Sequence, residues 1–340
     1  MQAIFRGSFG MALVCFVDDP HALQAVSNAS ESLLEIADDS CKAETLQEAV
    51  ADNAKISTGI VSEYTVPWSM EEVSRIHTAF FVGSFATVFI VDKSIRRFGP
   101  KRVALMGTLL AMGGALLTPL AIILVPTPFA VMAVRFIMGI GYCLFMPCGN
   151  TLISCWFPAQ ERSTAVAVFT TGNQIGMAFA MLMTSRICEI RWAGGWPLAF
   201  VIYALIAFFF VSLWTWRVVD KPRDHSSVSA EELEHITGHS VKLARALSAV
   251  HAIPYKKILC SLVILSLGIS AFGQTFVVIG IDTNLPKYYQ TALKMNLSSN
   301  GFFSASPFIV QVVTKLTFAV FADYLKVSLL NLVFLEKRNL

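Results

Sequence analysis

The chain has 340 residues, of which 55% are apolar and only 14% are charged, and its formal net charge is +3. Soluble proteins carry about 25% charged residues, and a soluble domain of this size has too little interior to bury so much apolar surface. The composition therefore excludes an ordinary soluble enzyme and predicts an integral membrane protein that crosses the bilayer several times. The small net charge gives no reason to expect a nucleic-acid partner, so the expected surroundings are membrane lipid.

The first apolar stretch, residues 2–17, is shorter than the roughly 20 residues that a membrane-spanning helix needs. It contains Arg6 and has two interpretations, a signal peptide with Arg6 at its charged end or the second half of a membrane helix. A convincing small-residue cleavage motif before Asp18 is lacking, which favours the helix. The segment that follows, 18–73, is acidic and contains no apolar span.

Seven later stretches have the length and composition of membrane-spanning helices. They are residues 74–92, 103–124, 129–156, 163–185, 196–216, 257–280 and 301–322. A polar segment, 217–256, divides them, so that six helices, counting the first stretch, precede it and two follow. The predicted fold class is all-α integral membrane, with a first six-helix unit, a central loop and a second unit.

Basic residues indicate which loops face the cytosol. Lys and Arg concentrate in the set of loops that includes 217–256, and cytosolic loops carry an excess of these residues. The central loop is therefore predicted to be cytosolic, whereas 18–73 and 281–300 face the lumen or the outside. Two N-x-[ST] sequons, at Asn28 and Asn296, fall on the predicted luminal side and are candidate glycosylation sites.

Six helices, a cytosolic central loop and further helices form the layout of a major facilitator transporter. Six motifs then occur in a fixed order. They are Phe157-Pro-x-x-Glu-Arg-Ser163, Gly194-Gly-Trp-Pro197, Val228-Ser-Ala-Glu-Glu232, Ile253-Pro-Tyr-Lys256, Asn300-Gly-Phe-Phe-Ser-Ala-Ser-Pro307 and Ala322-Asp-Tyr-Leu325. The ordered set resembles the anion:cation symporter family, which includes sialin, the vesicular glutamate transporters and the type I sodium–phosphate co-transporters. That family has two six-helix halves, so the resemblance implies a first half over 1–216, an incomplete second half over 257–340, and truncation at both ends.

The resemblance implies a secondary active transporter that moves a small organic anion or phosphate by alternating access, coupled to sodium or protons. It implies no enzymatic activity and no cofactor or metal beyond the co-transported ion. The plasma membrane and a lysosomal or vesicular membrane are both open as locations. An alternative is also open, namely a truncated, transport-incompetent membrane protein that is a regulatory isoform or an incomplete gene model.

Charged residues at bilayer depth are costly, so each one needs a reason. Arg6 and Arg135 match the family's first-helix and fourth-helix arginines, which the resemblance implies contact the anionic substrate. A guanidinium group binds a carboxylate or phosphate through two parallel hydrogen bonds. Arg135 lies near the luminal end of its span, so an interfacial anchor is its alternative role. His77 matches a second-helix histidine of the glutamate-transporting branch and is the candidate for proton coupling, with an interfacial histidine without such a role as the alternative.

Three further residues are assigned to the cavity with no defined role. Lys315 lies mid-span and has no family counterpart, so lining the cavity and pairing with another residue are both open roles. It is expected to face lipid if neighbouring helices are absent. Proton-coupled members carry a glutamate seven residues after the fourth-helix arginine, where this chain has Tyr142, and glutamate transporters have an arginine where it has Gln274. A proton carried by a carboxylate at position 142, and glutamate as substrate, are therefore not expected.

The cysteines predict neither a zinc site nor a redox motif, because the seven include no C-x-x-C pair. Cys41 and Cys188 fall on the predicted luminal side, where a disulfide could join them. Two free thiols are the expected state.

Overall fold

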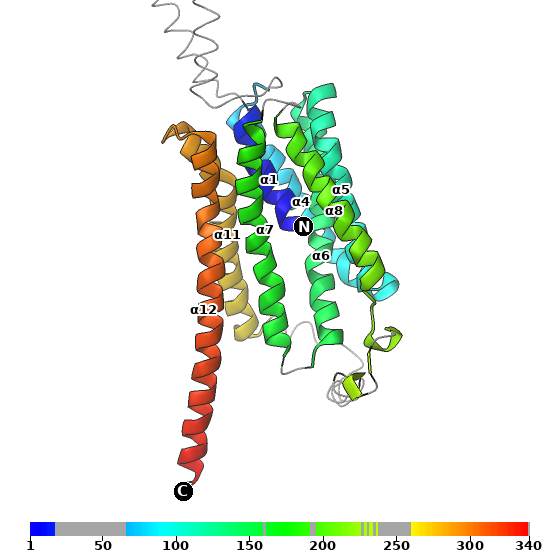
Figure 1. Ribbon diagram of the computed structural model, residues 1–340, viewed down its shortest axis with the longest axis vertical. Helices are drawn as coiled ribbons and strands as arrows, with labels where there is room; N and C mark the ends of the chain where they lie inside the picture. Colours follow the sequence, from blue (N-terminus) through cyan, green and yellow to red (C-terminus); the bar gives the residue numbers. More distant parts are fainter. Residues whose placement is uncertain are drawn as a thin grey trace, which may run out of the picture.

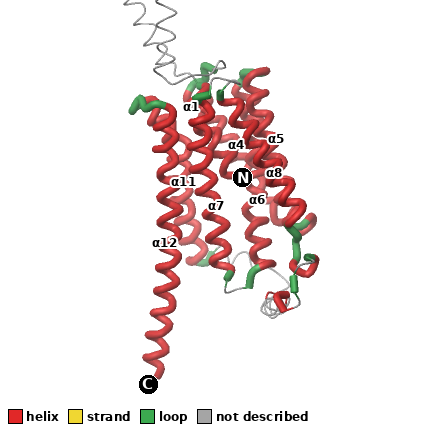
Figure 2. Tube along the Cα trace, viewed as in Figure 1, coloured by secondary structure: helices red, strands yellow, loops and turns green. Residues whose placement is uncertain are grey.

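The computed structural model describes residues 1–17, 66–158, 161–190, 195–225, 228–229, 231–233, 236 and 260–338, the last twenty of them (319–338) by their backbone alone. Within these ranges all named elements are helices, and the β-contact is one isolated bridge between Val17 and Val66 (Figure 2). This confirms the all-α class. Asn28, Cys41 and most of the central loop lie outside the described residues.

The helices form an elongated bundle (Figure 1). In chain order they are α1 (Gln2–Phe16), α4 (Met70–Phe98), α5 (Pro100–Leu124), α6 (Pro128–Trp156), α7 (Arg162–Cys188), α8 (Trp196–Arg217), the 3-10 helix η2 (Pro222–Asp224), α11 (Leu262–Thr291) and α12 (Leu297–Arg338). By length and composition, α4 to α8 and α11 can each cross a membrane, and α1 is shorter. Two predicted spans stop too early, because α11 continues beyond 280 to Thr291 and α12 continues beyond 322 to Arg338. The other predicted spans agree with the helices to within a few residues.

Local sequence explains where several helices begin. Ser69 caps α4 through a capping box, in which its hydroxyl accepts a hydrogen bond from the Glu72 N–H while the Glu72 carboxylate accepts one from the Ser69 N–H. Proline occupies the first turn of α5, α6 and α8, where its missing N–H has no helical partner to lose. Gly99 joins α4 to α5 with φ of 82°, a conformation that glycine adopts without strain.

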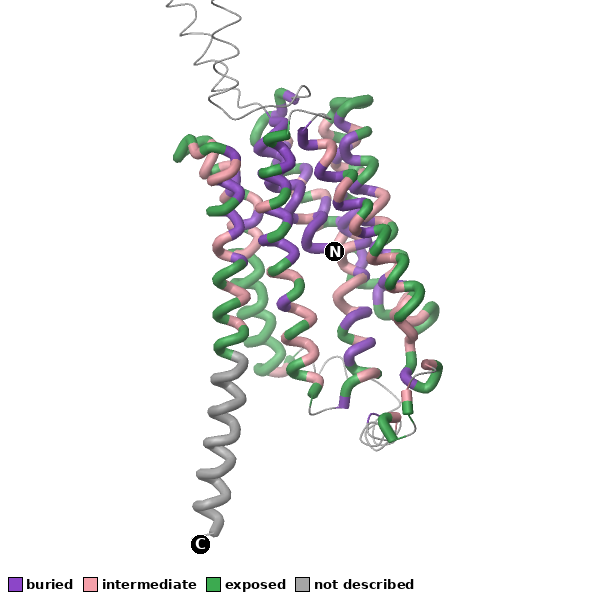
Figure 3. Tube along the Cα trace, viewed as in Figure 1, coloured by how far each residue is buried: buried purple, intermediate pink, exposed green. Residues whose placement is uncertain are grey.

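Helix α1 lies at the centre of the bundle. Every one of its residues except Arg6 is buried, and it contacts α5, α7, α8 and α11. Figure 3 shows buried residues gathered on α1 and on the helices beside it. The fold therefore surrounds the short first stretch with protein, which agrees with its interpretation as a helix of the bundle. Because Arg6 is enclosed in this way, its charge needs a partner within the protein.

Helices α4 and α6 cross in backbone contact at two glycines. A Cβ atom at Gly83 would overlap the carbonyl oxygen of Phe136, and one at Gly139 would overlap the carbonyl oxygen of Phe80. Small residues at a crossing allow two helices in a membrane to approach this closely. The contact fixes the height and rotation of α6, and with them the position of Arg135.

Helix α11 buries few of its residues against α1. Of its 30 residues only Asp282 and Pro286 are buried. Pro286 has no N–H to donate to the carbonyl of Asp282, and Gly10 of α1 approaches that carbonyl so closely that a Cβ would lie 3.2 Å from its oxygen. Asn300 of α12 donates a hydrogen bond to the Pro286 carbonyl at 2.7 Å. Asp282 is thus buried at a proline-interrupted turn against α1.

A disulfide joins Cys15 near the end of α1 to Cys188 at the end of α7. The expectation of a free thiol at Cys188 is therefore wrong. Cys15 lies in an apolar stretch far from Cys188 in the sequence, so the sequence gives no sign of the pairing. The fold brings the two Cα atoms to 6.3 Å from each other. The free cysteines among the described residues are Cys143, Cys148, Cys155 and Cys260.

Candidate functional site

Four helices bring charged or titratable side chains to one small hollow. Arg6 of α1, His77 of α4, Arg135 of α6 and Asp282 of α11 line it. Its remaining lining residues are Gly10, Phe80, Phe81 and Thr283. The volume of about 10 Å³ is at the lower limit for one water molecule. Three of the residues predicted from the sequence as functional therefore share one site.

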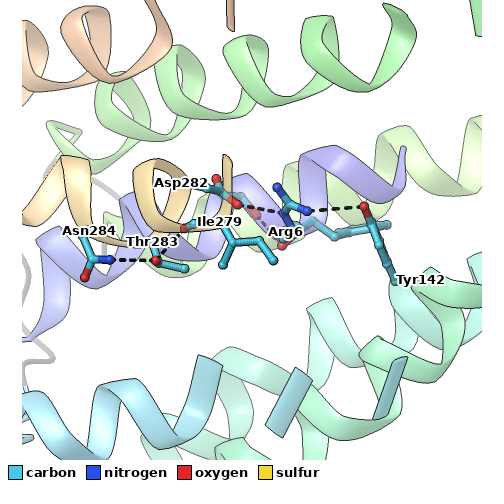
Figure 4. A network of polar contacts seen from close by, with 8 residues as sticks. Arg6, Tyr142, Ile279, Asp282, Thr283 and Asn284 are labelled. Carbon is cyan, nitrogen blue, oxygen red and sulfur yellow. Dashed lines mark hydrogen bonds and ion pairs between the residues drawn. The ribbon is translucent and has the colours of Figure 1, made fainter. Parts of the chain in front are cut away.

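Arg6 lies between Asp282 and Tyr142 (Figure 4). Its Nε donates to Asp282 Oδ2 at 2.7 Å, and its Nη1 donates to the Tyr142 hydroxyl at 3.4 Å. The Arg6 and Asp282 side chains are only 13% and 4% exposed. A charge-assisted bond in such surroundings is strong, and removing either partner leaves a buried charge uncompensated. Asp282 therefore neutralises Arg6.

Among the residues that the structure describes, no carboxylate pairs with Arg135. Its side chain is buried, with 2% exposure, and its guanidinium carbon lies 3.3 Å from the centroid of the Phe9 ring. The ring face attracts the cation but offers no hydrogen-bond acceptor in line with the guanidinium N–H groups. The alternative of an interfacial anchor is wrong for this arginine, because the side chain is enclosed by protein.

The hollow concentrates polar atoms that lack partners. Buried polar atoms are normally hydrogen-bonded, so each exception needs an explanation. Among the described residues, such atoms outside the hollow are Trp68 Nε1 and Gln174 Oε1. Those within it are Arg6 Nη2, His77 Nε2, Arg135 Nε, Arg135 Nη2 and Asp282 Oδ1. Since the arginine nitrogens can only donate, the hollow is suited to an acceptor that carries negative charge.

His77 completes the aromatic and basic wall of the hollow. Its ring lies edge-on to that of Phe9, with the centroids 5.5 Å apart. The same residue also lines a larger neighbouring cavity. The titratable side chain of His77 therefore lies between the hollow and the larger cavity.

Two larger cavities adjoin the Arg6 network. One of about 240 Å³ lies between α1, α4 and α11 and shares Gly10, His77 and Thr283 with the hollow. It reaches the end of the bundle where α1 stops and α4 starts, which is the predicted luminal end. The other, of about 170 Å³, lies between α1, α6 and α7 and is lined by Tyr142. Arg6 therefore contacts Tyr142, which lines the second cavity, and Asp282, whose neighbour Thr283 lines the first.

The remaining predicted residues lie elsewhere. Lys315 is partly buried and donates a hydrogen bond to Thr170 of α7, so the expectation that it faces lipid is wrong, because α12 packs on α7. Gln274 is exposed on α11 and does not line the hollow. Asn296 is exposed just before α12, and its glycosylation stays a prediction. In the described part of the chain no group of three His, Cys, Asp or Glu side chains could hold a metal ion.

Asp282 is the residue of the site that the sequence interpretation missed. The predicted span 257–280 ends two residues before Asp282, and 281–300 is predicted to be a loop that faces the lumen or the outside. The polar residues Asp282, Thr283 and Asn284 lowered the apolar content there. The available signal was an acidic residue one helical turn before a proline in continuation of an apolar helix, which is costly in a membrane without a partner.

Comparisons with known proteins identify the family. Residues 4–335 match the Major Facilitator Superfamily. Similar proteins include the chloroplastic ascorbate transporter of Arabidopsis thaliana, 30% identical over 260 residues (75% of this chain, 44% of the relative). Human sialin is 28% identical over 242 residues (71% and 47%). A putative inorganic phosphate cotransporter of Drosophila ananassae is 26% identical over 259 residues (76% and 53%).

The fold agrees with this assignment. The crystal structure of a D-xylose–proton symporter superposes with a TM-score of 0.55 at 14% identity, covering 95% of this chain and 69% of that one. The chain spans about half the length of the curated relatives it matches. Two of these relatives are named as transporters. The six helices of this chain that are long and apolar enough to cross a membrane agree with the prediction of a multi-pass membrane protein. The chain belongs to the Major Facilitator Superfamily, and its relatives agree with the anion:cation symporter family that its motifs resemble.

Proposed function

We propose that this protein is a secondary transporter that binds a small organic anion or phosphate at the hollow between Arg6 and Arg135. The observation that carries the proposal is Arg135, a buried guanidinium group with two nitrogen atoms that lack partners among the described residues. A buried charge without a counter-ion is unfavourable. An anion at the hollow would supply the counter-charge and accept the free hydrogen bonds.

The balance of charge in the hollow favours an anion. Arg6 and Arg135 contribute two positive charges and Asp282 one negative charge, so one positive charge is in excess when His77 is neutral. Phe80 and Phe81 line the hollow and limit the access of water, which strengthens the interaction between charges. A carboxylate or phosphate group matches the planar fork of a guanidinium.

The two cavities beside the Arg6 network support transport by alternating access. The cavity at His77 is a route from the predicted luminal end, and the cavity at Tyr142 is a route from the opposite side. Rocking of α11 and α12 against α1 and α4 would open one route while it closes the other. The driving ion in this proposal is a proton or sodium.

The names of two relatives supply chemical probes. One is named for ascorbate and another for inorganic phosphate, and both compounds are small anions at neutral pH. Their negative charge suits a site with two arginines. Since these two relatives are named as transporters, the alternative of a transport-incompetent membrane protein is not favoured.

Replacement of Arg135 by lysine tests the proposal. We would reconstitute the full-length product of the gene in liposomes and follow uptake of labelled ascorbate and phosphate under proton and sodium gradients in turn. Arg135→Lys keeps the charge but loses the planar fork, so uptake should fall about tenfold or more, the effect of losing a hydrogen bond to a charged group. The matched control is Arg75→Lys, at an exposed arginine on α4 that should tolerate the change.

Two results would contradict the proposal in different ways. Unchanged uptake by Arg135→Lys, at equal amounts of folded protein, would remove Arg135 from the site. Absence of saturable uptake of both probes by the unmodified protein would exclude these two anions as substrates and remove the chemical basis of the function.

A further inference from the structure

The Asp282 carboxylate binds Arg6 in the way that a substrate carboxylate would. Its Oδ2 accepts the Arg6 Nε–H at 2.7 Å, and it lines the same hollow as the free donors of Arg135. The carboxylate comes from α11, whereas Arg6 comes from α1 in the six-helix unit. A carboxylate of the protein thus holds one of the two arginines that the proposed anion needs.

We propose that Asp282 couples anion binding to a proton, because the anion displaces the Asp282 carboxylate from Arg6 and the displaced carboxylate then takes up a proton. This inference rests on the proposed function. The carboxylate is 4% exposed, and its second oxygen, Oδ1, has no partner among the described residues. Once separated from Arg6, it would be a buried charge without compensation, and such a group becomes neutral by binding a proton.

The exchange conserves charge in the hollow. Before binding, Arg6, Arg135 and Asp282 sum to one positive charge. The anion adds one negative charge, and the proton that converts the Asp282 carboxylate to a carboxylic acid adds one positive charge, so the sum is unchanged. No bond other than the new O–H bond forms, and the proton comes from water. An anion and a proton therefore enter together, which is the stoichiometry of a one-to-one symporter.

Other charged and titratable groups lie near Asp282, and one of them could take up the proton in its place. Arg6 of α1 and Arg135 of α6 stay protonated. The Tyr142 hydroxyl of α6 accepts a hydrogen bond from Arg6, and Lys287 lies further along α11 on the 240 Å³ cavity. His77 of α4 is the one real competitor, because an anion between the arginines would also favour its charged form.

The surroundings allow the carboxylate to move. Asp282 precedes Pro286 by one turn, at a place where the helix lacks one hydrogen bond. Its neighbour Thr283 lines both the hollow and the 240 Å³ cavity, which is the path by which a proton and an anion would arrive. A small rotation of α11 would therefore withdraw the carboxylate from Arg6 toward that cavity.

The test measures protons and anion together. The full-length protein in nanodiscs would be titrated with ascorbate in two buffers of different ionisation enthalpy, so that calorimetry gives both the dissociation constant and the protons exchanged. We expect about one proton taken up per ascorbate, and hence tighter binding at lower pH. Asp282→Asn should remove the proton uptake and tighten ascorbate binding about tenfold, because the competitor for Arg6 loses its charge.

Three variants make the outcome specific. Asp282→Glu keeps a carboxylate and should keep the proton uptake. His77→Gln should also keep it, whatever happens to affinity. Asp92→Asn removes an exposed carboxylate that is paired with Arg96 on α4, and should change nothing. Melting curves of each variant would establish that the protein compared is folded.

The results separate the two proposals. Ascorbate binding with undiminished proton uptake or weaker affinity in Asp282→Asn would overturn the role of Asp282 while the proposed function stands. Loss of proton uptake in His77→Gln alone would overturn it in favour of the histidine. Absence of saturable binding of ascorbate and of phosphate by the folded unmodified protein would overturn both proposals.

Discussion

The six-helix unit of α1 and α4 to α8 and the pair α11–α12 are apolar to a similar degree but are held in different ways. In the six-helix unit, α1 is buried along its whole length and α4 crosses α6 at glycines with their backbones in contact. On α11, by contrast, only an aspartate and a proline are buried, and side chains such as Leu262 and Phe272 are 80% and 73% exposed (Figure 3). Helix α11 is attached to α1 by polar contacts more than by packing, whereas α12 packs on α7.

The difference shows how a rigid unit and a movable one can be built from the same composition. Close packing has few alternative arrangements, so helices joined by it move as one body. An ion pair and a hydrogen bond such as that from Gln290 to the Val14 carbonyl can exchange partners with a ligand at little cost in area. The Arg6–Asp282 contact is therefore where α11 can separate from α1, whereas α12 packs closely on α7.

The largest expected effect concerns glycines in the two units. Gly139→Leu would force α6 away from the Phe80 carbonyl, and we expect a loss of stability on the order of 4 kcal/mol, enough to abolish folded protein. A Cβ atom at Gly268 of α11 would meet no atom within 4 Å, so Gly268→Leu should change stability by less than about 0.5 kcal/mol. Size-exclusion profiles and melting curves would check this. Equal damage by both variants would contradict the proposed contrast in packing.

The next effect concerns the ion pair itself. Arg6→Met or Asp282→Leu alone leaves one buried charge, and each should cost about 3 kcal/mol, whereas the double variant should lie within about 1 kcal/mol of the unmodified protein. A double-mutant cycle by denaturant unfolding in detergent measures the coupling. Additive losses in the double variant would mean that the two side chains do not depend on one another.

The disulfide gives an intermediate effect that is confined to the six-helix unit. The double variant Cys15→Ser/Cys188→Ser should lose at least about 2 kcal/mol, since the link closes a long segment of chain. Cys260→Ser, at an exposed cysteine next to α11, should have no effect on melting. Alkylation without reductant should leave Cys15 and Cys188 unmodified, and labelling of both would refute the link.

The smallest effect concerns the contact of α12 with α7. Lys315→Met removes one hydrogen bond to Thr170 at a partly buried position, and we expect a loss below about 1 kcal/mol. Thr170→Val removes the same bond from the other side and should match it in a thermal melt. A much larger loss for the lysine variant would assign Lys315 a second partner.

The spans could be predicted from the sequence because hydropathy reports directly on lipid contact. Most predicted spans end within a few residues of the helices. The end of α11 could not be placed in this way, because Asp282, Thr283 and Asn284 are polar residues that face protein or a cavity instead of lipid. Hydropathy cannot distinguish such a lining from a loop.

The basic residues of the site could be predicted from the sequence, but its acidic residue, Asp282, could not. Arg6, Arg135 and His77 stood out as charged or titratable residues in apolar stretches, and the fold brings them together. Their partners depend on contacts between helices far apart in the chain, such as the one from Arg6 to Asp282, 276 residues away. No local pattern encodes that pairing. Gln274 illustrates the converse, because alignment alone could not tell that it is exposed.

The disulfide between Cys15 and Cys188 also indicates that this end of the molecule has been exposed to an oxidising compartment. Disulfides form in oxidising compartments and are rare in the cytosol. Both cysteines lie at the end of the bundle from which the predicted luminal segment 18–73 departs, so only molecules inserted with that end in the lumen are expected to acquire the link. The fraction of cross-linked chains on a non-reducing gel would then count the correctly inserted molecules in any preparation, without a tag.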